Sequence, residues 1–267
     1  MSATQAFEKA RAEGRAALVG YLPAGFPDVA GGVAGVRTLA RCGADVIEVG
    51  FPYSDPVMDG PVIQRAAEAA LAAGVRPADV LRTVEGVAAT GAPVLVMSYW
   101  NPVERYGVER FARDLASAGG AGLITPDLIP DEAAEWIAAA DEHRLDRTFL
   151  VSPSSTDERL AMTVAHCRGF VYATALMGVT GARTSVSSQA PELVDRVRHT
   201  NPDMPVGVGL GVGTGAQAAE VAGFADGVIV GSALIRCVLE APDRATGLSR
   251  LRALSAELAE GVRNPAK

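Results

Sequence analysis

Three acidic side chains fall within 12 residues of one segment, at Glu48, Asp55 and Asp59. Glu48 lies in an apolar run, residues 45–49, where strand alternation turns it away from the aliphatic side chains on either side of it. A carboxyl group buried there has a raised pKa, which lets it act as acid and base near neutral pH. The alternative is a structural ion pair, but none of the expected strands contains Lys or Arg. We therefore expect Glu48 to be catalytic.

Asp59 precedes Gly60-Pro61, so it is either a second catalytic carboxylate or the residue of an Asx turn or helix cap. Three acids within 12 residues also suit a hard cation. No histidine lies near them, however. The three histidines fall on or beside expected helices, as surface residues or as partners of a helix C-terminal dipole: His143, His166 and His199. We expect no metal site.

Two glycine-rich segments, residues 206–217 and 228–235, join an apolar run to a helical window. Such a turn presents backbone N–H groups and the positive helix end to an anion, so we expect phosphate binding there. The alternative for single glycines is close packing of helix on strand. A third segment, residues 178–188, is rich in Gly, Ser and Thr and long for a connecting loop. It is either a closing lid or a flexible insertion.

The composition excludes several classes of function. The 267 residues carry 24 Lys plus Arg against 31 Asp plus Glu, a formal charge of −7, which argues against nucleic acid or an anionic membrane as partner. Lysine occurs only at positions 9 and 267, so a lysine-dependent aldolase is excluded. Three scattered cysteines fit a reducing compartment, and no signal peptide or apolar span is evident. We expect a cytoplasmic protein.

Short apolar runs alternate with helical windows along the whole chain. The runs are residues 17–22, 45–49, 93–97, 122–125, 148–151, 169–173, 205–209 and 225–230. The windows include residues 29–42, 62–73, 78–88, 108–118, 131–142, 156–166, 191–200, 215–223 and 245–262. Eight such units in about 250 residues are typical of a closed (β/α)8 barrel, in preference to an open doubly wound sheet. We predict a single TIM-barrel domain over 1–267 with an extra N-terminal helix.

The carboxyl ends of the barrel strands would carry the active site, and the acids and glycine turns fall there. Five blocks at these ends are YLPAGFP, IEVGFPYSDPVMDGP, SYWNP, GVTGAR and VGSALI. Together they resemble the α subunit of tryptophan synthase, across essentially the whole chain. The resemblance implies a lyase that cleaves indole-3-glycerol phosphate to indole and glyceraldehyde 3-phosphate. Two alternatives remain: a non-catalytic activator of a β subunit, and a stand-alone indole-releasing lyase.

The resemblance also implies roles for individual residues. Glu48 matches the general acid and base, Asp59 the acid that binds the indole N–H group, and Tyr172 a tyrosine that supports both. The phosphate cradle matches Gly181, Gly211, Gly231 and Ser232. The indole pocket and lid match Tyr21, Met97, Thr180 and Leu210. Leu176, Met177 and Leu210 depart from residues found in other members, which affects the lid and the indole contact rather than the chemistry.

The family works as an αββα complex, so the resemblance implies a β subunit as partner. Asp55, Asn101 and Pro102, with the segment after Asp127, match the side that faces it. Pyridoxal phosphate belongs to that β subunit, which receives the indole. This chain is therefore expected to need no cofactor of its own.

Overall fold

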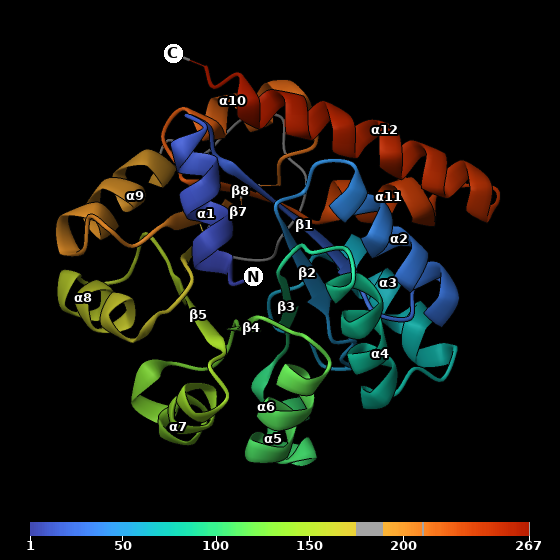
Figure 1. The fold of residues 1–267 in the computed structure, drawn as a ribbon, viewed down its shortest axis with the longest axis horizontal. Helices are drawn as coiled ribbons and strands as arrows, with labels where there is room; N and C mark the ends of the chain where they lie inside the picture. Colours follow the sequence, from blue (N-terminus) through green and yellow to red (C-terminus); the bar gives the residue numbers. More distant parts are fainter. Residues whose placement is uncertain (175–188, 210, 267) are drawn as a thin grey trace.

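The eight strands form one closed parallel barrel in sequence order, as predicted. Figure 1 shows this barrel in a computed structural model that describes residues 1–174, 189–209 and 211–266. The strands are β1 (Ala17–Pro23), β2 (Val46–Gly50), β3 (Val94–Met97), β4 (Gly122–Thr125), β5 (Asp146–Val151), β6 (Val171–Thr174), β7 (Val206–Gly209) and β8 (Gly227–Val230). Each strand begins and ends within one or two residues of the predicted apolar run.

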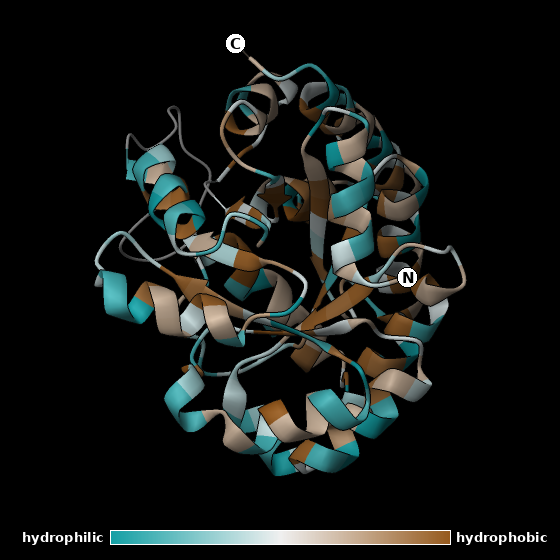
Figure 2. Ribbon diagram, turned by 60° about the vertical axis from the view of Figure 1, so that its left-hand side comes forward, coloured by the Kyte–Doolittle hydropathy of each residue, from teal (hydrophilic) through white to brown (hydrophobic). Residues whose placement is uncertain are grey.

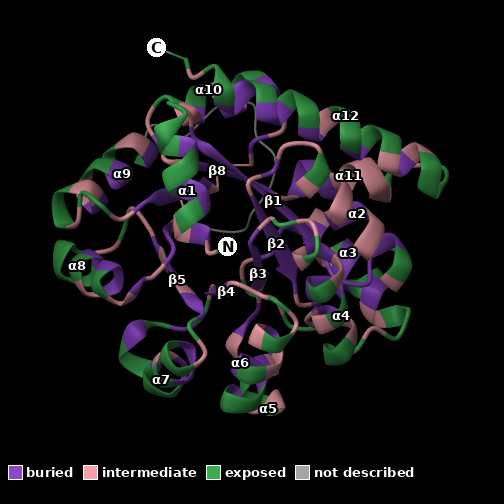
Figure 3. Ribbon diagram, viewed as in Figure 1, coloured by how far each residue is buried: buried purple, intermediate pink, exposed green. Residues whose placement is uncertain are grey.

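Helices surround the barrel and turn their polar faces outward, so that the buried residues gather on the strands (Figures 2 and 3). They are α1 (Ala3–Ala12), α2 (Val29–Arg41), α3 (Pro61–Ala72), α4 (Pro77–Ala88), α5 (Trp100–Tyr106), α6 (Val108–Ser117), α7 (Ala134–Glu142), α8 (Asp157–His166), α9 (Gln189–Thr200), α10 (Gly215–Ala222), α11 (Ser232–Leu239) and α12 (Arg244–Arg263). None of the helices that the structure describes is both long and apolar enough to cross a membrane.

Local signals set several helix ends. The Asp28 carboxylate caps α2 by accepting a hydrogen bond from the Gly31 N–H group at 2.8 Å. Gly43 follows the end of α2 with a φ of 109°, a conformation that favours glycine. The helix in the window 131–142 is shorter than predicted, because a 3-10 turn at Pro130–Glu132 precedes α7.

Two further features differ from the sequence expectations. Helix α5 was not among the windows, because it spans only seven residues and holds Pro102, which is tolerated in a first turn. Strand β5 begins two residues early and so includes Arg147, which makes the expectation of strands without Lys or Arg wrong. The Arg147 side chain nevertheless pairs with Asp141 and the His166 carbonyl oxygen, on the helix side of the barrel. It therefore does not neutralise Glu48.

The strand registers arrange the interior side chains in layers. Tyr21 pairs with Glu48 on β2, and the register can be followed from strand to strand around the barrel. It returns to β1 at a position eight residues before Tyr21, so the barrel has a shear of eight. With this shear, alternate strands contribute four side chains to each layer. The layer that contains Glu48 is completed by Ile124, Tyr172 and Ile229. Glu48 and Tyr172 thus face each other from opposite strands.

Helix α1 closes the amino-terminal end of the barrel (Figure 1). The Ala3 N–H group donates to the Asp146 carboxylate at 2.8 Å. The Phe7 ring stacks on Phe170 with centroids 5.0 Å apart, within the cluster that fills the barrel interior. Because this end is filled, a ligand can enter only at the carboxyl ends of the strands, which we call the mouth.

Replacing Phe7 by alanine should lower the free energy of unfolding by about 3–5 kcal/mol, because it leaves a cavity over Phe170. Urea denaturation checks this through the midpoint at constant m-value. Phe7→Leu, which retains most of the volume, should cost clearly less. An unchanged midpoint for Phe7→Ala would mean that α1 does not stabilise the barrel.

Candidate active site

Glu48 lies in the middle of β2 with its side chain inside the barrel. It is 1% exposed, and its Oε2 atom has no hydrogen-bond partner among the described residues. Burial, and after it the nearby negative charge of Asp59, raises the pKa of Glu48 to about 8. The carboxyl group therefore holds a proton at neutral pH and can donate it to a bound molecule.

Asp59 lies in the loop that follows β2, two residues before α3 begins at Pro61. Gly60 occupies the N-cap position of α3, so Asp59 is not the helix cap that its sequence allowed. Its Oδ1 atom instead accepts a hydrogen bond from the Tyr99 hydroxyl at 3.1 Å. Burial raises the pKa of Asp59, and the Tyr99 hydrogen bond opposes that rise. Glu48 and Asp59 thus differ in their partners although both are buried.

Tyr99 is a site residue that the sequence reasoning missed. It directly follows Ser98, just past the end of β3, and is 5% exposed. Its hydroxyl group accepts a hydrogen bond from the Met58 N–H group at 3.0 Å while it donates to Asp59. The signal was available, because Tyr99 lies within the SYWNP block at a strand end, but nothing local indicates a contact with a residue 40 positions away.

Two further tyrosines, Tyr21 and Tyr172, lie on the inner faces of β1 and β6. Burial raises the pKa of each, and the charges of Glu48 and Asp59 raise it further, so both rings adjoin the two acids. Glycines make room for them. A Cβ atom at Gly50 would lie 2.3 Å from the Tyr21 hydroxyl oxygen, and one at Gly209 2.6 Å from that of Tyr172. Glycine at these strand ends therefore leaves room for the two rings, which a larger side chain would displace.

The predicted phosphate residues that the structure describes follow β7 and β8 at the mouth. Gly211 has a φ of 71°, in the region that favours glycine. Gly231 precedes the first turn of α11, and a Cβ atom there would lie 3.1 Å from the Tyr21 ring. Ser232, the first residue of α11, is buried. A helix N-terminus thus adjoins the pocket of Tyr21, which is a favourable place for an anion.

The remaining predicted residues divide into described and undescribed ones. Met97 ends β3 and packs against the interior cluster, on the side of the mouth. The predicted lid, residues 178–188, lies outside the described part of the chain together with its Thr180 and Gly181, and so do Leu176, Met177 and Leu210. The site therefore unites Glu48, Asp59, Tyr21 and Tyr172 with the turns after β7 and β8.

The predicted partner-facing residues lie beside this mouth. Asp55 and Asn101 are exposed, and Pro102 is half-buried. The Trp100 N–H group donates to Asp127 at 2.8 Å, which joins α5 to the loop after β4. Two large apolar side chains are exposed on these loops: Val57, at 70%, and Ile129, at 45%. Both residues follow strands at their carboxyl ends, Val57 after β2 and Ile129 after β4.

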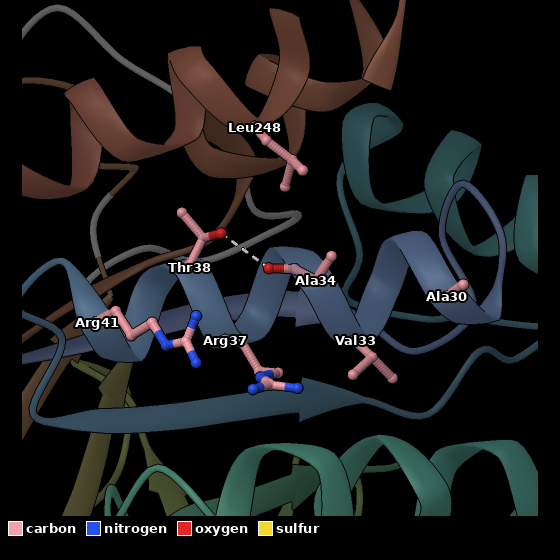
Figure 4. A pocket seen from close by; sticks show the side chains of 7 residues that line it. All are labelled: Ala30, Val33, Ala34, Arg37, Thr38, Arg41 and Leu248. Atoms are coloured by element: carbon pink, nitrogen blue, oxygen red, sulfur yellow. Dashed lines mark hydrogen bonds between the residues drawn. The ribbon is translucent and has the colours of Figure 1, made fainter. Parts of the chain in front are cut away.

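Other candidate features lie outside the barrel. The three histidines are at the C-terminal ends of α7, α8 and α9, as predicted. His143 shares the outer surface with Glu109 and Glu142, whose oxygen atoms lie within 4.8 Å of its ring nitrogen. A hollow of about 390 Å³ lies along α2, between its side chains and Leu248 of α12 (Figure 4). None of the residues that line it is among those predicted for the site.

Comparisons with known proteins converge on one family. A model of the family "Tryptophan synthase alpha chain" matches residues 7–263. The tryptophan synthase alpha chain of Salinispora arenicola is 73% identical over 98% of this chain and 97% of its own. That of Mycobacterium tuberculosis is 63% identical over 96% and 93% of the two chains.

Solved structures give the same result. A structure of M. tuberculosis tryptophan synthase superposes with a TM-score of 0.92 at 62% identity and covers 98% of both chains. The subunit alpha from Legionella pneumophila gives a TM-score of 0.86 at 36% identity, with 99% of both chains covered. The predicted barrel and the resemblance are confirmed.

The raised pKa of Glu48 predicts a pH dependence of stability. Folded protein holds this proton up to pH about 8, whereas the unfolded chain releases it near the ordinary pKa of 4.5. The folded state binds more protons between these values, so the Glu48 contribution to stability is lost as the pH rises from 4.5 to 8. Glu48→Gln removes this loss. The difference in thermal midpoint between Glu48→Gln and the unmodified protein should therefore increase from pH 4.5 to pH 8 and stay constant above pH 8.

Glu85→Gln is the matched control, because Glu85 is exposed on α4. Its midpoint relative to the unmodified protein should stay constant between pH 5 and pH 9. A flat difference for Glu48→Gln as well would contradict a raised pKa at Glu48.

Proposed function

The chain belongs to the tryptophan synthase alpha chain family, whose members are lyases that cleave indole-3-glycerol phosphate to indole and glyceraldehyde 3-phosphate, and we propose that Glu48 and Asp59 perform this cleavage here. The observation that carries the proposal is the Glu48 carboxyl group, buried and without a partner among the described residues, with a pKa near 8. Such a group can both deliver and accept a proton at neutral pH.

The cleavage requires two proton transfers, and one carboxyl group can serve both. Protonated Glu48 gives its proton to C3 of the indole ring, which places positive charge on the ring. The bond between C3 and the glycerol chain then breaks, and its electrons return to the ring. The glycerol hydroxyl becomes the carbonyl of glyceraldehyde 3-phosphate as it loses its proton to the Glu48 carboxylate. Glu48 thereby recovers its proton for the next turnover.

Asp59 has the complementary role. Its carboxylate accepts a hydrogen bond from the indole N–H group and stabilises the positive charge on the protonated ring. Its hydrogen bond from the Tyr99 hydroxyl favours the ionised form that this role requires. Tyr172 lies in the same layer as Glu48 and packs beside the substrate, while Tyr21 and Met97 line the indole pocket. Thr180 and Leu210 complete the pocket and lid in this proposal.

The phosphate group of the substrate binds at the turns after β7 and β8. Gly211, Gly231 and Ser232 present backbone N–H groups there, and Gly181 completes the cradle in this proposal. The first turn of α11 adds the positive end of a helix dipole. Binding by N–H groups is compatible with the formal charge of −7, because it needs no basic side chain. These turns place the phosphate beside Tyr21 and therefore the indole toward Glu48 and Asp59.

Family members need no cofactor for this reaction in the alpha chain. We propose that the partner is a pyridoxal-phosphate-containing β subunit, in an αββα complex that receives the indole. Support comes from Asp55, Asn101 and Pro102 at the mouth, together with the exposed Val57 and Ile129. We also propose that residues 1–267 form one domain, because the eight strands close a single barrel. We propose that the protein is cytoplasmic, since the three cysteines are free.

Glu48→Gln and Asp59→Asn should each lower kcat for indole release. Loss of a general acid and base costs about 10²- to 10⁴-fold, and loss of an electrostatic stabiliser about 10²- to 10³-fold. Indole release from indole-3-glycerol phosphate, with and without the β subunit, measures both. Glu85→Gln, which removes an exposed carboxylate from α4, should keep full activity. Normal turnover by Glu48→Gln would refute its role.

The partner surface can be tested separately. Ile129→Asp places an unpaired charge at an exposed apolar residue of the proposed partner surface, so the Kd for the β subunit should rise roughly 10- to 100-fold. Calorimetry or gel filtration with the β subunit measures this, and indole release by the isolated chain should be unchanged. Ala256→Asp adds the same charge on the exposed side of α12 and should not affect binding. Equal affinities for the two variants would place the partner elsewhere.

A further inference from the structure

The Tyr99 hydroxyl group ties down the end of the loop between β2 and α3. It accepts a hydrogen bond from the Met58 N–H group at 3.0 Å and donates one to the Asp59 carboxylate at 3.1 Å. One oxygen atom therefore fixes both the backbone before Asp59 and its side chain. The position of Asp59 depends on the direction in which the Tyr99 ring points.

The backbone of Tyr99 is well anchored. Tyr99 immediately precedes α5, and the next N–H group, that of Trp100, donates to Asp127 at 2.8 Å. An anchored backbone leaves rotation of the Tyr99 side chain as the remaining freedom. Something that packs against the ring must restrain this rotation if the hydroxyl is to stay between Met58 and Asp59.

Tyr53 supplies that restraint from the other end of the same loop. Its ring lies against Tyr99, with centroids 5.4 Å apart and the planes tilted by 35°. This arrangement is favourable for two aromatic rings. The Tyr53 hydroxyl oxygen accepts a hydrogen bond from the Asn101 Nδ2 group at 3.2 Å. Tyr53 is thus held at its outer end by the first turn of α5, two residues beyond Tyr99.

We propose that Tyr53 is a positioning residue for the cleavage reaction, which acts on Asp59 through the Tyr99 ring and is itself held by Asn101. The inference rests on the catalytic role proposed above for Asp59. Tyr53 is half-buried and does not need to touch substrate for this role. Four side chains then form a chain of contacts from the exposed Asn101 to the buried acid.

A double-mutant cycle of Tyr53→Leu and Tyr99→Phe tests the positioning role of Tyr53, with indole release measured in the presence of the β subunit. Tyr99→Phe removes the hydroxyl and should lower kcat about 10- to 100-fold, the cost of a hydrogen bond to a charged group. Tyr53→Leu removes the ring contact and should lower kcat roughly 3- to 10-fold. KM should change less than about twofold in Tyr53→Leu, because Asp59 acts mainly on the charge that develops during the reaction.

The cycle separates positioning from general stability. If Tyr53 acts through the Tyr99 hydroxyl, Tyr53→Leu should cost less than about twofold further in the Tyr99→Phe protein. Tyr53→Phe retains the ring and should recover most of the activity that Tyr53→Leu loses. An equal loss in both backgrounds, an unchanged kcat, or a rise in KM alone would each overturn the proposal.

Tyr106→Leu is the matched control. Tyr106 makes an edge-on ring contact with Phe111 at 5.8 Å and a hydrogen bond to Asp114 at 2.7 Å, on the outer helices. Its loss should lower the thermal midpoint and leave kcat unchanged. Asp59→Asn separates the two proposals. If it stays active, both fail; if it loses activity while Tyr53→Leu does not, only the role of Tyr53 fails.

Discussion

Burial of the Glu48 carboxyl group is the constraint on which the rest of the site depends. A charged carboxylate without a partner is costly inside a barrel, so the group keeps its proton up to pH about 8. A lysine or arginine within reach would remove that cost and with it the chemistry. The one arginine on a described strand, Arg147, instead pairs on the helix side. Burial of Glu48 therefore lowers the stability of the protein near neutral pH, and it leaves the carboxyl group protonated, as its proposed role requires.

Two tyrosine rings that adjoin Glu48 need glycine neighbours. Tyr21 and Tyr172 fill the space beside the acid, and side chains at Gly50 or Gly209 would overlap their hydroxyl groups. The amino-terminal end is filled by Phe7 and Phe170. A substrate can therefore approach only from the mouth, where the glycine turns also lie. The same residue type thus shapes the pocket and, in the proposed function, supplies the backbone N–H groups that bind the phosphate.

The regular alternation of apolar residues in the sequence allowed the barrel and the inward direction of Glu48 to be predicted. Strand alternation alone indicated that Glu48 points inward, because one register is compatible with aliphatic neighbours on the opposite face. The contacts of Tyr99 could not be predicted in this way. They join a strand end to a loop 40 residues earlier, and short loops have no repeating pattern that indicates their partners. Helix α5 was missed for a related reason, since a seven-residue helix that contains a proline carries little periodic signal.

The two acids are held by different kinds of structure, and this suits the different tasks proposed for them. Glu48 is part of a strand paired on both sides, so its position is set by the barrel itself. Asp59 ends a loop and depends on side-chain contacts with Tyr99 and, through it, Tyr53. In the proposed mechanism, the proton donor Glu48 must approach one carbon atom closely, whereas Asp59 must be oriented toward the positive charge on the indole ring. Loop side chains can adjust that orientation without disturbing the barrel that sets the acidity of Glu48.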